Sequence, residues 1–86
     1  MGKKIMNKNI PIKQMFIKIY GVSDIATFVA NALQVNGDVI VKINKFIVNG
    51  KSLKGMFAIE PSEGITVEYP ANAIAFEEFL KQFKAE

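Results

Sequence analysis

The stretch DVIVKINKFIVNGKSLKGMFAI, residues 38–59, carries the clearest structural signals in this chain of 86 residues. Its first half is rich in branched apolar residues, which predicts one strand at 38–43 and a second at 46–48. The two residues between them, Asn44 and Lys45, are the number that a tight hairpin requires. We therefore predict a β-hairpin in this part of the chain.

A short helix is predicted directly after the hairpin. Asn49 and Gly50 close the hairpin, and Ser52 has the side-chain chemistry of a helix N-cap. The apolar residues that follow have helical spacing and extend the helix to about residue 59. They are Leu53, Met56 and Phe57.

Upstream of the hairpin, the sequence predicts a strand and then an amphipathic helix. Residues 15–20, MFIKIY, alternate between two faces, and Gly21 ends the strand. Ser23 is the expected N-cap of the helix, and Asp24 suits its first turn. The helix has apolar residues at helical spacing up to the turn at Asn36-Gly37, namely Ile25, Phe28, Val29, Ala32 and Leu33.

Downstream, residues 61–64 predict a loop, residues 64–69 a strand and residues 71–84 a terminal helix. In that helix Glu77 is placed to pair with Lys81 at i,i+4. The helix carries an apolar stripe that we assign to the core, formed by Ile74, Phe76, Phe79, Leu80 and Phe83.

The predicted order is β-α-β-β-α-β-α, which indicates the α+β class. Each element needs a partner surface for its apolar side, so we expect a two-layer open-faced sandwich: a four-stranded antiparallel sheet with three helices on one face. The other sheet face then carries Phe16, Tyr20, Ile40 and Ile47. These are either ordinary exposed apolar residues or a contact for a partner or a second copy, so both a monomer and a homodimer remain open.

Composition excludes much chemistry. The chain has no histidine, cysteine, tryptophan or arginine, which removes disulfides, thiolate and imidazole metal ligands, and catalytic triads. Glu60, Glu63 and Glu68 lie on a predicted loop and an alternating strand, so we expect solvated carboxylates rather than a metal site. We therefore predict a protein that is not an enzyme and has no metal or cofactor. The lack of cysteine fits a cytoplasmic protein.

The net charge of +3 is unevenly distributed. Residues 1–14 contain four lysines and no acid, whereas residues 15–86 are nearly neutral. We interpret 1–14 as a basic tail, either non-native or disordered, and 15–86 as the domain. A weak contact of the tail with anionic partners is the alternative. No apolar stretch is long enough to cross a membrane.

Residues 51–57, KSLKGMF, resemble the regulatory segment of HPr, the phosphocarrier of the bacterial sugar phosphotransferase system. The predicted order and lengths of the elements over roughly residues 15–83 resemble that family as well. The resemblance implies the HPr-like fold and two functional positions.

The first position in the family is a histidine that accepts and passes on phosphate, followed by an arginine and a proline. Here the corresponding residues are Val22, Ser23 and Asp24. Serine does not replace the histidine, because an alkoxide is a poor leaving group, and Asp24 would repel phosphate. We expect a degenerate phosphocarrier loop that carries no phosphate, similar to the catabolite-repression HPr homologues.

The second position is a serine that a dedicated kinase modifies in HPr of many Gram-positive bacteria, and Ser52 matches it. From its own chemistry Ser52 is equally an ordinary N-cap. The family binds partners with residues beside this serine, which makes Lys51, Leu53, Lys54, Met56 and Phe57 the candidate partner-binding residues. Lys54 departs from the family, which usually has an apolar residue there.

The resemblance thus implies a non-catalytic HPr-like protein with a regulatory or scaffolding role in carbon-catabolite control. Its partners would be an HPr kinase or a transcriptional regulator. Two other hypotheses remain open: a small-molecule-binding α+β module, and a nucleic-acid-binding module that uses the lysine-rich tail, which we regard as the weaker one.

Overall fold

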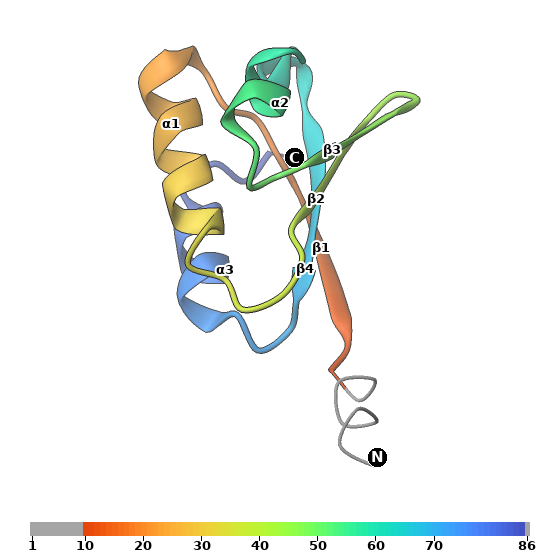
Figure 1. The fold of residues 1–86 in the computed structure, drawn as a ribbon, viewed down its shortest axis with the longest axis vertical. Coiled ribbons are helices and arrows are strands. Elements are labelled where there is room, and N and C mark those ends of the chain that lie inside the picture. The colour runs from red at the N-terminus through yellow and green to blue at the C-terminus, as the bar shows by residue number, and fades with distance from the viewer. Residues whose placement is uncertain (1–9, 86) are drawn as a thin grey trace.

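The computed structural model describes residues 10–85, and Figure 1 shows how its elements are arranged. In chain order the elements are β1 (Ile12–Ile17), α1 (Gly21–Ala32), β2 (Ile40–Ile43), β3 (Phe46–Asn49), α2 (Leu53–Phe57), a 3₁₀ turn (Pro61–Glu63), β4 (Ile65–Pro70) and α3 (Ile74–Lys81). The predicted β-α-β-β-α-β-α order is confirmed.

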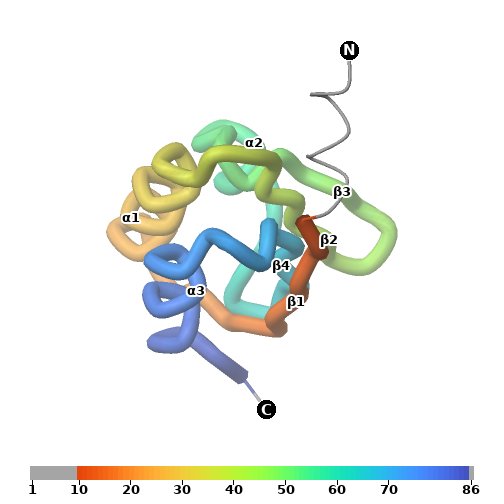
Figure 2. The backbone as a smooth tube through the Cα atoms, turned by 90° about the horizontal axis from the view of Figure 1, so that it is seen from below, coloured from red at the N-terminus to blue at the C-terminus, as the bar shows by residue number. Residues whose placement is uncertain are grey.

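The four strands form one antiparallel sheet in the order β1-β4-β2-β3. All three helices lie on the same side of it, which leaves the other face uncovered by helices (Figures 1 and 2). The predicted open-faced α+β sandwich is therefore confirmed.

The core lies between the sheet and the helices. Most of the apolar residues that we predict to be buried face this core. Val41 of β2 and Val67 of β4 are opposite each other and fully buried. The helices contribute Ile25, Phe28, Val29, Ala32, Met56, Phe76 and Leu80. Two predicted core residues, Leu33 and Ile74, are instead 57% and 60% exposed because they lie at helix ends.

The strand predicted at residues 15–20 begins and ends earlier than expected. Strand β1 begins at Ile12, where Ile12 lies opposite Pro70, and it ends at Ile17 rather than at residue 20. Lys13 lies opposite Tyr69, so residues 12–14 of the predicted tail belong to the sheet. Residues 12–14 are all exposed, Ile12 included, so this half of the strand has no buried apolar face. Residues 1–9 lie outside the described part.

Other boundaries differ from the predictions by a few residues. Helix α2 ends at Phe57, and α3 covers 74–81 instead of 71–84. Part of the predicted loop at 61–64 is a 3₁₀ turn that begins with Pro61. The following Gly64 has a positive φ of 106°, and a Cβ at this residue would run into the Phe16 ring.

The open sheet face combines apolar and polar side chains. Phe16 and Ile47 are 44% and 69% exposed, as predicted. Tyr20 is also exposed, but it lies at the start of α1 and not in β1. Between the apolar side chains, Glu68 accepts hydrogen bonds from Gln14 at 2.7 Å and from Lys42 at 2.8 Å.

Candidate functional site

The N-terminus of α1 holds the residues that correspond to the phosphocarrier loop. The helix begins at Gly21, whose φ is +87°, and Tyr20 is its N-cap without a side-chain hydrogen bond. The prediction of Ser23 as N-cap is wrong: the N-cap lies three residues earlier, at Tyr20, so Ser23 lies within the first turn. Asp24 is in the first turn, as predicted, and Val22 is 67% exposed.

The turn before α2 places Ser52 at the start of that helix. The Ser52 Oγ accepts a hydrogen bond of 3.0 Å from the Gly55 amide, and the Ser52 carbonyl accepts one of 3.0 Å from Met56. Upstream, the Asn49 side chain accepts from the Lys51 amide at 2.9 Å. The predicted N-cap is confirmed, and the turn around it is tightly hydrogen-bonded.

The two lysines beside Ser52 have different roles. The Lys51 ammonium donates a 2.8 Å hydrogen bond to the Val35 carbonyl, just beyond the end of α1. This contact ties the turn before α2 to the neighbouring helix. Lys54 is exposed on α2, so it is the lysine whose charge faces solvent beside Ser52.

The apolar residues of α2 divide between the core and the surface. Met56 is completely buried, because helical spacing turns it inward, so we withdraw it as a candidate for direct partner contact. Leu53 and Phe57 are each 44% exposed. With Lys54 they form what we call the α2 surface: Leu53, Lys54 and Phe57. Helix α2 packs against α1, as Figure 2 shows, so the α2 surface lies on the helix that adjoins the one bearing Val22.

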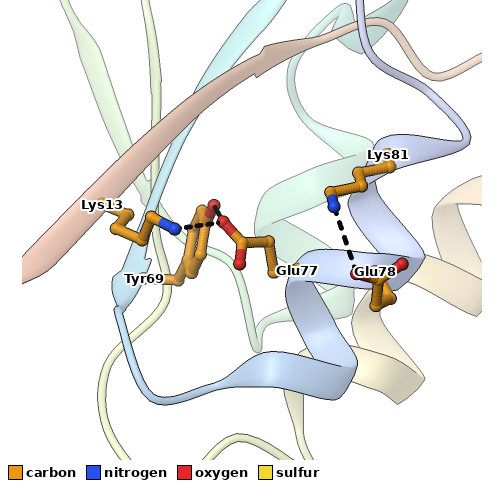
Figure 3. Close-up of polar contacts among 5 residues, drawn as sticks. All are labelled: Lys13, Tyr69, Glu77, Glu78 and Lys81. Atoms are coloured by element: carbon orange, nitrogen blue, oxygen red, sulfur yellow. Dashed lines mark hydrogen bonds and ion pairs between the residues drawn. The ribbon is translucent and has the colours of Figure 1, made fainter.

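Two glutamates form polar contacts that sequence reasoning missed. Glu77 was predicted to pair with Lys81, but its carboxylate lies 2.7 Å from the Lys13 ammonium and accepts from the Tyr69 hydroxyl at 2.9 Å (Figure 3). Lys81 pairs with Glu78 instead, at 3.1 Å. Partners far apart in sequence leave no local pattern, so only the strand register could have indicated the contact between Glu77 and Lys13.

Glu68 is the second of these glutamates, on the open sheet face. The hydrogen bond from Lys42, followed by that from Gln14, holds the pKa of Glu68 below its usual range, although partial burial opposes this. The Glu68 carboxylate therefore stays ionised near neutral pH and keeps its hydrogen bonds to Lys42 and Gln14. Glu60 and Glu63, by contrast, are exposed, as predicted.

Two kinds of feature are absent from residues 10–85. No group of three or more carboxylates is arranged to hold a metal ion there. In the same part of the chain, no helix is long and apolar enough to span a bilayer.

Comparison with known proteins supports the fold. No protein-family model matches the sequence, and no curated protein matches it. A solved structure does match: the phosphocarrier protein HPr from Bacillus anthracis str. Ames, with a TM-score of 0.64 and 21% sequence identity. The match covers 86% of this chain and 98% of that one. At this identity the likeness establishes the HPr-like fold of the chain.

Proposed function

We propose that this protein is a non-catalytic HPr-like docking protein with a regulatory or scaffolding role in phosphotransferase-system and carbon-catabolite control. One observation carries the proposal: the chain has the fold of a phosphocarrier but contains no histidine. In this proposal the fold serves to present a surface to a protein partner, in the cytoplasm, and does not carry phosphate between enzymes.

The start of α1 supports the absence of carrier chemistry. Val22, Ser23 and Asp24 offer no imidazole for a phosphoramidate and no guanidinium for phosphate binding. Asp24 places a carboxylate in the first turn, where it would repel a phosphoryl group. Incubation with the phosphorylated first enzyme of the system should therefore leave this protein unmodified.

The α2 surface supports the docking role. Leu53 and Phe57 expose apolar area beside the cation of Lys54, and exposed apolar residues flanked by charge are typical of protein contact sites. Ser52 directly precedes them and is partly exposed. Phosphorylation there would add about two negative charges at neutral pH at the edge of the docking surface. By analogy with the family, the partners are an HPr kinase or a transcriptional regulator.

Incubation with a bacterial HPr kinase and ATP tests the role of Ser52. Intact-mass spectrometry should find one added phosphate, and the Ser52→Ala variant should remain unmodified. Authentic HPr is the positive control in the same reaction. If authentic HPr is modified and this protein is not, then Ser52 is not the switch. A phosphate that survives in Ser52→Ala would also overturn the assignment.

A further inference from the structure

A groove of about 410 Å³ lies between β3 and the segment that runs from α2 to the 3₁₀ turn, apart from the α2 surface. Its size is within the range of ligand-binding clefts. Most of the lining is apolar and comes from Ile43, Phe46, Ile47, Val48, Ala58 and Ile59. Glu60 and Glu63 are the charged residues of the lining.

The strand register places the groove on the side of the sheet that bears the helices. Val48 lies opposite Val41, and Phe46 lies opposite Ile43. Val41 and Ile43 both belong to the core, and directly opposed residues share a sheet face. Beyond the core, this side of the hairpin is open: Phe46 is 64% exposed.

The groove adjoins the β3 edge of the sheet, where charged side chains and proline, two of the usual protective devices, are missing. Strand β3 is the last strand of the sheet, and its sequence, FIVN, contains no charge and no proline. Proteins usually guard an edge with charged side chains, proline or a covering segment. The edge at β1 has such devices: it carries Lys13, and the Ala85 amide donates to the Phe16 carbonyl at 3.0 Å.

The backbone of Ile47 is available for pairing at the β3 edge. Phe46 and Ile43 flank the two-residue turn and pair with each other. Because antiparallel ladders alternate, the amide and carbonyl of the next residue, Ile47, point away from β2. A strand added at this edge would bond to Ile47 and place every second side chain on the groove side.

The charge of the groove indicates the kind of strand that fits. Glu60 and Glu63 are exposed, and neither makes an ion pair within the described chain. The lining contains no lysine. A matching occupant therefore presents an apolar side chain to the groove and a basic side chain to the two carboxylates.

We propose that β3 and this groove bind an extended segment of a partner protein by strand addition. The segment carries an apolar residue and, two positions further on, a lysine or arginine, so that both side chains lie on the groove side. Backbone hydrogen bonds provide affinity in this mode of recognition, and the side-chain pockets provide specificity. The site is distinct from the α2 surface, so its test is independent of the proposed function.

The test uses the capped peptide Thr-Ile-Thr-Lys-Thr-Lys and the ¹⁵N-labelled full chain. Titration should shift the amide signals of residues 46–48, 58–60, 62 and 63. The double variant Glu60→Gln/Glu63→Gln should weaken binding about fivefold, since exposed ion pairs are individually weak. The matched control, Asp38→Asn/Glu78→Gln, changes the net charge equally but outside the groove and should bind like the wild type.

Two altered peptides complete the test. Replacing both lysines by glutamate should abolish binding, and N-methylation of the amides that face β3 should do the same, because it blocks strand pairing. The proposal is overturned if millimolar peptide shifts no signals or shifts signals outside the groove. It is also overturned if the two double variants weaken binding equally, or if the N-methylated peptide binds as well as the parent peptide.

Discussion

The Tyr69 hydroxyl donates a 2.9 Å hydrogen bond to the Glu77 carboxylate, which ties β4 to α3 (Figure 3). Lys13 of β1 reaches the same carboxylate oxygen at 2.7 Å. The contact joins three elements at the edge of the core. It also links the N-terminal half of β1 to α3.

The first prediction concerns Glu77 and acid. The Lys13 ammonium, followed by the Tyr69 hydroxyl, holds the pKa of Glu77 below its usual range. A lowered pKa in the folded state adds stability above the unfolded-state pKa of about 4.3, and this stability is lost as the pH falls through the folded value. Glu77→Gln should therefore lower the urea midpoint at pH 7 much more than at pH 3. An equal loss at both pH values would contradict the assignment.

Glu78→Gln is the matched control for that experiment. Glu78 is on the same helix, is largely exposed and pairs with Lys81 at 3.1 Å. Exposed pairs contribute little, so this variant should unfold like the wild type at both pH values.

The second prediction concerns Tyr69 and alkali. Burial, followed by the hydrogen bond to Glu77, raises the pKa of Tyr69 to about 12. Because the folded-state pKa is raised, its contribution is fully present below the unfolded-state pKa of about 10 and is lost as the pH rises through the folded value. Ultraviolet titration should show a tyrosine that ionises near 12 and is missing in Tyr69→Phe. If that titration persists in the variant, it belongs to another group.

The third prediction compares Ser23 and Ser52, which the sequence predicts equally as helix N-caps. Ser52 is an N-cap, so Ser52→Ala should lower the free energy of unfolding by about 1 kcal/mol. Ser23 caps no helix, so Ser23→Ala should change it by less than about 0.5 kcal/mol. Urea denaturation of both variants measures the difference, and equal effects would refute the assigned helix starts.

The fourth prediction concerns Gly64. A side chain there is disfavoured by the φ of 106° and by the Phe16 ring, so Gly64→Ala should cost about 1–3 kcal/mol. Adding Phe16→Ala should recover the steric part of this loss and not the backbone part. If the two substitutions are simply additive in denaturation experiments, the ring is not what excludes the side chain.

The fifth prediction concerns truncation of the lysine-rich N-terminal segment, which tests the nucleic-acid hypothesis. Removing residues 1–14 also deletes half of β1 and the contact of Lys13 with Glu77, so it should lower the melting temperature strongly. A chain that starts at Ile10 keeps both and should melt close to the full chain. Only the chain that starts at Ile10 can therefore test whether the lysine-rich segment binds nucleic acid. If this chain and the one that lacks residues 1–14 melt at the same temperature, the position of β1 is wrong.

The features that the sequence predicts correctly are those that depend on residues close together in the chain. The hairpin turn at Asn44-Lys45 and the cap at Ser52 depend on neighbouring residues, and both are confirmed. The predicted pair of Glu77 with Lys81 is wrong, because Lys13 lies 64 positions away in sequence and comes near Glu77 only through its place opposite Tyr69 in the sheet. Met56 was assigned to the candidate surface by family analogy, although the direction of its side chain depends on how α2 packs on α1.

The groove beside β3 was not predicted for the same reason. Ile47 and Glu60 belong to different elements, and no sequence pattern indicates that they line one cavity. The exposed apolar residues of the hairpin are the one available signal, and the alternation of the strand indicates only that Ile47 belongs to the open sheet face.

The central claim is that the fold presents the α2 surface to a protein partner. Titration of the ¹⁵N-labelled protein with bacterial HPr kinase, with authentic HPr in parallel, tests it most directly. We predict shifts at Leu53, Lys54 and Phe57, and weaker binding by Phe57→Ala than by Phe16→Ala on the open sheet face. If the kinase binds authentic HPr but shifts no signals here, or shifts only those of the open sheet face, the claim is wrong.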